Sequence, residues 1–475
     1  MIIQEIITNF ATYSKSPRMP YFKRRIDQYL FEWKNSRNRK PLLVRGARQI
    51  GKSCSIRNFA KTFKYFIEIN FEKRKDLINL FENEFDVTII CQRLSILYSV
   101  PIIPGETLLF LDEIQASEAA IKSLWFFKEN LPDLHVIAAG SLLEFALKTI
   151  SSYGVGRVSS MFMYPMSFEE FLWALGKESW AAAIESASSE NPIFDSLYKD
   201  ITSTYRTFLL TGGMPASVTA WIETKDFREC INELADIQQT YYDDFAKYSE
   251  KISPQLLRNT LQSVVAQSGG KFVYSKVSGG YRIEEVKDAL ERLTDAGIIK
   301  PVKMSSSNGL PLGSEVNEKF TRYIYLDTGL MLRILDLDFG GTQPITELIL
   351  AGSEEQLVNK GNMAEISAGW ELVKAADVRH RHELYYWENL TKGTTSEVDY
   401  VMAKNMQILP IEVKAGTSGK MKSLRFFMEK KDLTFGVRTS LENFSMLTIK
   451  SDTIERHIEI IPIYAIGRLT RKDTL

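Results

Sequence analysis

The sequence has few cysteines, few histidines and no excess of charge of either sign. Its 475 residues include three cysteines, Cys54, Cys91 and Cys230, and four histidines. Cysteines so far apart argue against a zinc cluster and against a disulfide framework, so we expect a reducing, cytoplasmic location. Lysine plus arginine and aspartate plus glutamate both number 59, so any basic surface for nucleic acid must be local.

Long apolar runs are absent as well. No stretch of about 18 apolar residues occurs, so we expect no membrane-spanning helix, and the acidic Glu5 within Met1–Tyr13 argues against a secretory signal peptide. A hydrophobic content of 44% and a charged content of 25% are typical of a globular protein. At a prior of about 150 residues per domain, this length favours about three domains.

The most informative stretch is a glycine-rich loop after a short apolar run. Residues 42–53 read LLVRGARQIGKS, which matches the phosphate-loop pattern G-x-x-x-x-G-K-[ST]. The two glycines let backbone N–H groups point inward around an anion at the start of the next helix. Lys52 is expected to reach the β- and γ-phosphates of ATP, and the Ser53 hydroxyl to be a ligand of Mg²⁺. The predicted nucleotide-binding residues are Gly46, Ala47, Arg48, Gln49, Ile50, Gly51, Lys52, Ser53 and Cys54, with Cys54 expected to be a small buried helix residue.

A second motif lies some sixty residues downstream. Thr107–Glu113 contains four apolar residues followed by two carboxylates, the Walker B arrangement. Asp112 is expected to hold the Mg²⁺ shell and Glu113 to polarise the attacking water. Further apolar stretches at Tyr65–Phe71 and Leu134–Ala139 alternate with helical patterns, which predicts a parallel sheet covered on both faces.

Two more residues are candidates for the same site. Ser141 follows Leu134–Ala139, where open α/β sheets place ligands, so it is predicted to orient the water or sense the γ-phosphate. Alternatively, Ser141 caps the following helix, Leu142–Lys148. Arg157 is the candidate for stabilising transition-state charge, in its own chain or across subunits. An ordinary surface arginine is the alternative there.

The most basic stretch is residues 18–40, where aromatic residues alternate with arginine and lysine. We favour an amphipathic helix over Arg24–Asn35 that packs its aromatic residues on the ATPase sheet and keeps its charges in solvent. The alternative is a surface for nucleic acid or for the adenine ring, with Arg24 and Arg25 as contacts.

Helices dominate the middle of the chain. Helices are predicted over Phe194–Leu210, Ile231–Tyr248, Leu256–Ser268 and Arg282–Ala296, with helix punctuation at Thr211–Pro215, a strand position at Phe272–Tyr274 and a hairpin of Ile298–Met304 with Tyr323–Leu326. This order fits a winged helix. Its recognition helix, Arg282–Ala296, is rich in acidic residues, which favours a structural or protein-contact role over DNA reading.

The last part of the chain places an acid on one strand and the pattern E-x-K on the next. Alternation along Gln407–Lys414 sends Glu412 and Lys414 to one face, and a hairpin with Ser396–Val401 would bring Asp399 close. A helix over Lys360–Ala375 adds Glu365. The expected remaining strands are Glu383–Asn389, Leu433–Thr439, Leu447–Ile449 and Ile458–Ile466.

This acid and lysine pattern resembles the PD-(D/E)xK nucleases. By that resemblance, Asp399 and Glu412 would hold a divalent metal, Lys414 would help activate water, and Glu365 would complete the acidic set. The alternatives are a chance pattern or an inactive nuclease fold kept for binding. Basic residues around an expected Ser418–Glu429 helix suit a phosphodiester backbone or a solvated helix face: Lys420, Lys422, Arg425, Lys430 and Lys431.

Across its length the chain resembles the AAA-type ATPases that carry a C-terminal domain of unknown function in bacteria and archaea. The resemblance rests on Gly46–Ser53, Leu108–Glu113, Gly140-Ser141, Gly156-Arg157, Pro165–Phe171, Gly212–Pro215 and Tyr241–Phe245. It implies an α/β chain with a P-loop ATPase domain, a winged-helix middle and a restriction-endonuclease-like C-terminal domain of mixed α/β structure. We therefore expect an ATPase domain over 1–175, a helical linker over 176–250, a winged helix over 251–340 and a nuclease-like domain over 341–475.

The expected activity is ATP binding and hydrolysis with Mg²⁺, coupled to DNA or RNA binding or processing through a second divalent metal. One rival is an ATP-dependent switch that binds a protein partner and keeps a silent nuclease fold. Another rival is a signalling or defence ATPase in which the nucleotide controls homo-oligomer formation.

Overall fold

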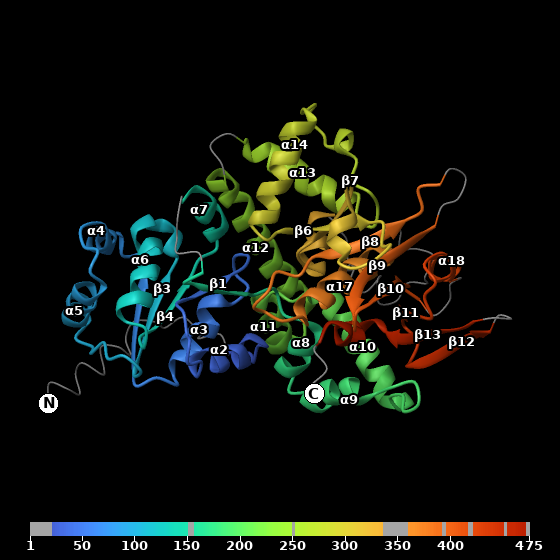
Figure 1. Cartoon of the computed structure of the whole chain (residues 1–475), viewed down its shortest axis with the longest axis horizontal. Coiled ribbons are helices and arrows are strands. Elements are labelled where there is room, and N and C mark those ends of the chain that lie inside the picture. The colour runs from blue at the N-terminus through green and yellow to red at the C-terminus, as the bar shows by residue number, and fades with distance from the viewer. Residues whose placement is uncertain are drawn as a thin grey trace.

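The computed structural model of the chain describes residues 21–150, 156–248, 252–335, 360–391, 396–416, 421–450 and 454–471. Two sheets stand at opposite ends of the molecule, with the helices of the middle part of the chain between and above them (Figure 1). None of the helices in these ranges combines the length and the apolar composition needed to cross a membrane.

The first sheet is parallel throughout. It contains β1 (Leu42–Arg45), β2 (Tyr65–Asn70), β3 (Thr107–Asp112), β4 (His135–Ala139) and β5 (Ser159–Phe162), in the spatial order β2-β3-β4-β1-β5. All residues of β3 and β4 are buried, as is usual where helices cover both faces of a parallel sheet. The predicted parallel sheet is confirmed.

Helices cover this sheet on both sides. They are α2 (Ile26–Lys34), α3 (Lys52–Ala60), α4 (Ile78–Glu82), α5 (Val87–Tyr98), α6 (Glu118–Asn130), α7 (Leu143–Thr149) and α8 (Phe168–Ala174). Alternation along β1 divides the core, because Leu42 and Val44 join the hydrophobic cluster that includes Ile56 of α3. Leu43 joins the other cluster, with Ile121 of α6. Because β1, β3 and β4 run parallel, their carboxyl ends lie at one edge of the sheet.

The middle of the chain follows the predicted order of helices and a hairpin. It contains α9 (Glu178–Ser186), α10 (Asp195–Thr211), α11 (Pro215–Thr224), α12 (Phe227–Tyr248), α13 (Pro254–Ala266), α14 (Ile283–Asp295), β6 (Ile299–Ser305), β7 (Val316–Tyr325) and α15 (Thr328–Ile334). The strand expected at Phe272–Tyr274 is wrong. Phe272 donates one backbone hydrogen bond to Thr321, but the chain then curls into the 3₁₀ turn Tyr274–Lys276 and the pairing stops.

The last part of the chain contributes α17 (Lys360–Lys374), β8 (Leu384–Glu388), β9 (Glu397–Lys404), β10 (Gln407–Val413), α18 (Lys422–Lys430), β11 (Phe435–Ser440), β12 (Ser445–Lys450) and β13 (Glu455–Pro462). The expected strand to residue 466 is too long. Pro462 has no N–H to continue a ladder, and Ile463–Thr470 forms a 3₁₀ helix. The helix expected to begin at Ser418 begins at Lys422, and residues 417–420 lie outside the described ranges.

The second sheet joins the middle hairpin to the C-terminal strands. Its order is β12-β13-β11-β10-β9-β8-β6-β7. β6 pairs in parallel with β8, from Val302 opposite Leu384 to Met304 opposite Tyr386. A single sheet therefore runs across the division at residues 340 and 341 that the sequence suggested.

Candidate active site at the phosphate loop

The phosphate loop lies between β1 and α3, and its two pattern glycines have backbone conformations that favour glycine. Gly46 has φ +142°, and a Cβ atom there would lie 2.2 Å from the Met163 carbonyl oxygen. Gly51 has φ +97° in the left-handed region. Any side chain at Gly46 would displace the backbone at Met163, so the close approach of the segments that follow β1 and β5 fixes this residue type.

Lys52 and Ser53 begin α3 and face the ends of the loop and of β3. The Lys52 ammonium group is buried and donates to the carbonyl oxygens of Gly46 at 2.9 Å and Ala47 at 2.7 Å. Burial lowers the pKa of Lys52 to about 8. The Ser53 hydroxyl donates to Asp112 Oδ1 at 3.0 Å.

Asp112 is held from a second side by a residue that the sequence reading missed. Asn70, at the end of β2 and directly opposite Asp112 in the sheet register, donates its side-chain amide to Asp112 Oδ2 at 3.0 Å. Burial, with the nearby Glu113 charge, raises the pKa of Asp112. Hydroxyl and carboxylate oxygens in contact at a buried site are the donor set that Mg²⁺ prefers, so these residues fit the metal of a nucleotide site.

Glu113 is oriented by two neighbours. Its backbone adopts φ +49°, in the left-handed region. Its Oε2 accepts hydrogen bonds from Gln115 Nε2 at 2.7 Å, from the Ser141 amide at 3.3 Å and from the Ser141 hydroxyl at 3.4 Å. The residue before α7 is Leu142, without a side-chain cap, so the capping alternative for Ser141 is wrong. The arrangement brings the predicted water-polarising carboxylate and Ser141 into contact.

Gln115 was also missed by the sequence reading. A Cβ atom at Gly140 would lie 1.9 Å from the Gln115 side-chain oxygen, so Gly140 leaves room for this glutamine. A glycine directly after a buried strand was the available signal.

The middle of the phosphate loop, at Arg48, contacts helix α12. Arg48 forms an ion pair with Asp244 of α12 and approaches Glu72 at 3.9 Å. The Tyr241 hydroxyl, also on α12, donates to the Arg48 carbonyl oxygen at 2.8 Å. Cys54 is exposed, so the expectation of a buried cysteine is wrong, because α3 turns Ile56 toward the sheet instead.

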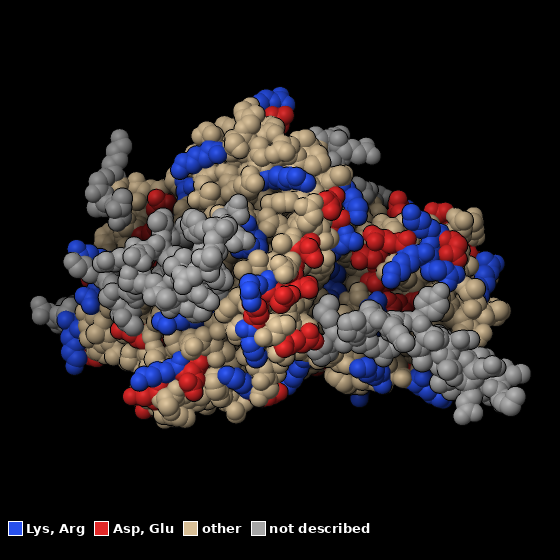
Figure 2. Space-filling view, turned by 180° about the vertical axis from the view of Figure 1, so that it is seen from behind, with Lys and Arg blue, Asp and Glu red and all other residues tan. Residues whose placement is uncertain are grey.

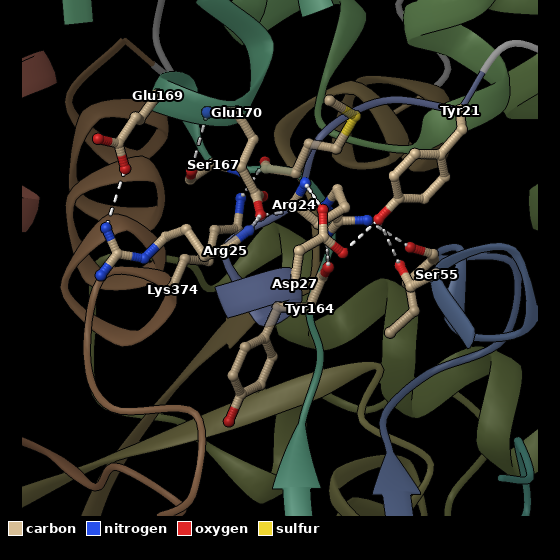
Figure 3. A network of polar contacts seen from close by, with 12 residues as sticks. Tyr21, Arg24, Arg25, Asp27, Ser55, Tyr164, Ser167, Glu169, Glu170 and Lys374 are labelled. Atoms are coloured by element: carbon tan, nitrogen blue, oxygen red, sulfur yellow. Dashed lines mark hydrogen bonds and ion pairs between the residues drawn. The ribbon is translucent and has the colours of Figure 1, made fainter. Parts of the chain in front are cut away.

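Arg24 and Arg25 are held within a polar network under the loop (Figure 3). Arg24 is 5% exposed and donates to the carbonyl oxygens of Ile50 at 2.8 Å and Tyr164 at 2.7 Å. Its Nε lies 3.1 Å from Glu170. Arg25 pairs with Glu169 at 2.9 Å and donates to the Ala375 carbonyl oxygen at 3.0 Å. The expected solvated charges are therefore wrong at both positions.

Arg157 lies near the amino ends of the strands, whereas the phosphate loop follows the carboxyl end of β1. It precedes β5, whose first residue, Ser159, pairs with Leu42 at the start of β1. Its guanidinium pairs with Glu129 at 2.5 Å and lies 4.6 Å from the centre of the Trp125 ring. The length of β1 separates Arg157 from Gly46, so an action on the loop of its own chain is wrong; an action on another copy stays a prediction.

The four residues of the nuclease-like pattern form one electrostatic cluster. Lys414 Nζ lies 2.6 Å from Glu412 Oε1, and the Val413 amide donates to Asp399 Oδ2 at 2.6 Å. Burial raises the pKa of Asp399 well above its usual range, with Glu365 and Glu412 adding to the effect. Burial also raises the pKa of Glu365 to about 7.

The cluster does not form a metal site as arranged. Among the described residues, no three histidine, cysteine, aspartate or glutamate side chains are placed to hold a metal ion. However, Glu412 Oε2 is buried without a hydrogen-bond partner. An orphaned carboxylate oxygen beside two other acids is the chemistry that a divalent cation would satisfy.

Some of the basic residues expected near this cluster form hydrogen bonds with neighbouring side chains. Lys430 donates to Asn389 Oδ1 at 3.1 Å and Lys431 to Asn308 Oδ1 at 2.5 Å. Lys420 lies outside the described residues. On the face shown in Figure 2, lysine and arginine lie interspersed with aspartate and glutamate rather than in one large basic field.

Three family models match separate parts of the chain. Residues 38–172 match an AAA domain. Residues 202–339 match a domain of unknown function, DUF8612, and residues 360–466 match another, DUF4143. No curated protein sequence matches the chain.

Solved structures show distant similarity. The Walker-type ATPase PABY2304 of Pyrococcus abyssi is 16% identical with a TM-score of 0.44, covering 68% of this chain and 99% of that one. The ORC1 protein of Aeropyrum pernix, solved in complex with DNA, is 11% identical with a TM-score of 0.30, covering 68% and 95%. PCH-2 of C. elegans is 15% identical with a TM-score of 0.22, covering 56% and 68%. The family match shows that residues 38–172 are similar to AAA domains, which supports a P-loop ATPase domain of the AAA type in this part of the chain.

Proposed function

We propose that the chain binds ATP with Mg²⁺ and hydrolyses it at the phosphate loop, and that the nucleotide controls the middle and C-terminal segments. The observation that carries the proposal is the contact of Ser53 with Asp112 beside the contact of Glu113 with Ser141. A metal-binding pair and an oriented carboxylate next to an anion cradle are the parts that phosphoryl transfer to water needs.

Each residue then has a distinct role. The loop amides and Lys52 bind the β- and γ-phosphates, for which Lys52 leaves the Gly46 and Ala47 carbonyl oxygens. Ser53 and Asp112 would hold Mg²⁺, which would neutralise phosphate charge when bound. Glu113 accepts a proton from the attacking water, and Ser141 orients Glu113.

The test compares ATP turnover and ATP binding in Glu113→Gln with the wild type. Because a positioned general base contributes about a hundredfold or more, we expect turnover to fall by at least that factor while ATP binding is retained. Glu118→Gln is the matched control, since Glu118 is an exposed glutamate of α6 paired with Lys122. Unchanged turnover in Glu113→Gln, or a wild type that binds no ATP, would contradict the proposal.

Contacts between the loop and the middle segment support the proposed coupling. Gly297, with φ +72°, lies beside the loop, and a Cβ atom there would be in van der Waals contact with the Ala47 amide nitrogen at 3.4 Å. Lys148 of α7 pairs with Glu291 and Asp295 of α14, each at 2.6 Å. A change at the loop would therefore reach α14 directly. Because part of the acidic face of α14 is engaged by the ATPase domain, we favour a structural role for this helix over DNA reading.

For the C-terminal segment we propose nucleic-acid processing with a second divalent metal. Asp399, Glu412 and Glu365 would hold the metal, and Lys414 would help activate water. The raised carboxyl pKa values and the orphaned Glu412 oxygen support this reading. The rival is an ATP-dependent switch that binds a protein partner or a second copy of the chain and keeps a silent nuclease fold. The Lys414–Glu412 pair favours this rival, because it occupies one carboxylate oxygen.

One assay separates the two readings. ATP turnover and strand cleavage are followed with single-stranded DNA, duplex DNA and RNA, in Mg²⁺ or Mn²⁺. The nuclease reading predicts cleavage that is lost in Asp399→Asn and Lys414→Met and kept in Lys450→Met, an exposed lysine of β12. No cleavage and no stimulation of turnover by any nucleic acid would favour the switch, and an ATP-dependent shift in size-exclusion chromatography would identify a homo-oligomer.

A further inference from the structure

A small cavity lies where the three parts of the chain meet. Its lining comes from the start of the phosphate loop, the segment after β5, the middle hairpin and the C-terminal segment. These contribute Gly46, Tyr164, Lys300, and Trp370 with Arg381. Its volume is about 70 Å³, whereas one water needs about 10–15 Å³ on the same measure. The cavity therefore has room for a small polyatomic ion.

Lys300 is the unusual member of this lining. It belongs to β6 and is only 7% exposed. Within the described part of the chain its ammonium group has no hydrogen bond or ion pair, whereas the other two equally buried lysines have partners: Lys52 binds loop carbonyls and Lys374 binds the Met166 carbonyl oxygen at 3.0 Å. A lysine that is almost wholly buried and whose ammonium group has no hydrogen bond or ion pair with the described protein groups is a candidate for ligand binding.

The carboxylates around the cavity are already paired with other cations. Glu383 pairs with Lys303 at 2.7 Å, Glu144 accepts from Arg45 Nε at 2.6 Å, and Asp295 pairs with Lys148 at 2.6 Å.

A second cation of the lining is only loosely paired. Arg381 approaches Glu144 at 3.7 Å, while Glu144 is held more closely by Arg45. The Arg381 side chain is 42% exposed and is therefore partly solvated. Lys300 is attracted within the protein by Glu383, which pairs more closely with Lys303, so the unfilled requirement at Lys300 is for an anion.

Tyr164 adds a hydroxyl group to the same lining. Its ring points away from the Arg24 contacts (Figure 3), although its backbone carbonyl oxygen belongs to them. Burial raises the pKa of Tyr164 to about 12, so the hydroxyl is a neutral hydrogen-bond donor at neutral pH.

We propose that this cavity binds a small tetrahedral oxyanion, with inorganic phosphate as the representative ligand, and that Lys300 is its principal contact. Arg381 and the Tyr164 hydroxyl complete the donor set. Phosphate could come from solution or from ATP hydrolysed at the adjoining loop; the second source rests on the proposed function, whereas the site itself does not.

Phosphate binding to the full chain tests the site, measured by equilibrium dialysis with labelled inorganic phosphate at pH 7 in the absence and presence of saturating ADP with Mg²⁺. We expect binding that persists with ADP, and at least a tenfold loss of phosphate affinity in Lys300→Met and Lys300→Gln. Lys319→Met, an exposed lysine of β7, should match the wild type. Because Lys300 is buried without a partner, Lys300→Met should melt at the same or a higher temperature than the wild type, which separates lost binding from lost folding.

Each result of the phosphate dialysis either supports or overturns the inference. Phosphate binding that is absent, that ADP abolishes, or that both Lys300 variants retain overturns the inference. If the wild type binds no ATP, the proposed function fails while the dialysis without nucleotide still decides the cavity. The time course of phosphate release during ATP turnover shows where the phosphate in the cavity comes from. If release lags behind hydrolysis in the wild type but not in Lys300→Met, the phosphate comes from ATP. If there is no lag, the phosphate comes from solution.

Discussion

Replacing Arg24 tests whether the polar network under the phosphate loop stabilises the ATPase domain. The side chains of Arg24 and Glu170 are each 6% exposed, and Arg24 also holds the Ile50 and Tyr164 carbonyl oxygens. Removing one partner of a buried ion pair costs about 3–5 kcal/mol, because the other charge stays buried. Glu170 keeps hydrogen bonds from the Arg25 and Ser167 amides, so we expect Arg24→Met to cost about 3 kcal/mol, at the lower end of that range.

Urea or thermal unfolding of the full chain measures this cost. At about 2–4 °C per kcal/mol for a domain of this size, the transition of the ATPase domain should fall by about 6–12 °C. The exposed pair of Arg74 with Asp76 supplies the control, since Arg74→Met should cost no more than about 1 kcal/mol. Combining Arg24→Met with Glu170→Gln should cost less than the sum of the two changes, because the second change removes the uncompensated charge. Additive changes, or an Arg24→Met as stable as Arg74→Met, would refute the reasoning.

Two further predictions concern Arg157 and Glu371. Arg157 and Glu129 are both about half exposed, so Arg157→Ala should cost at most about 1 kcal/mol in unfolding and leave ATP turnover of dilute, monomeric protein unchanged; lost turnover in the monomer would contradict the placement of Arg157. Burial raises the pKa of Glu371 from its usual 4.5 to about 7, so the folded state holds this proton more tightly and the stability due to Glu371 is full below pH 4.5 and is lost as the pH rises toward and through 7. The stability of the wild type relative to Glu371→Gln should therefore decrease across that window in urea titrations, and a difference independent of pH would contradict the assigned environment.

Residues with local signatures were the ones that the sequence could predict. The phosphate loop and the Walker B acids each occupy a few adjacent positions, and a parallel sheet brings their strand ends to one edge whatever the rest of the chain does. Arg24 has no such signature. Its burial depends on Glu170 and Tyr164, some 140 residues away. The helical periodicity around Arg24 predicts a solvated side chain because it contains no information about these distant partners. The placement of Arg157 away from the loop of its own chain could not be predicted for a related reason, since it depends on the register of β5 with β1.

In the C-terminal segment, too, local patterns could be predicted from the sequence and long-range pairings could not. Alternation along β10 correctly placed Glu412 and Lys414 together, because the period of a strand is a local property. The pairing of β6 with β8 joins residues about 80 positions apart and leaves no periodic trace in either strand. The pattern of acids likewise predicts which side chains meet but not whether their oxygens converge on one metal.

The shared second sheet has a consequence for how the chain folds as it is synthesised. The hairpin of β6 and β7 leaves the ribosome before β8, so the edge of β6 at Val302–Met304 waits with unpaired backbone groups until residues 384–386 follow. An open edge beside buried apolar residues is a site for pairing with the wrong chain. Fragments that end before β8 should therefore aggregate, and the hairpin should reach its native state only after the C-terminal strands have been made.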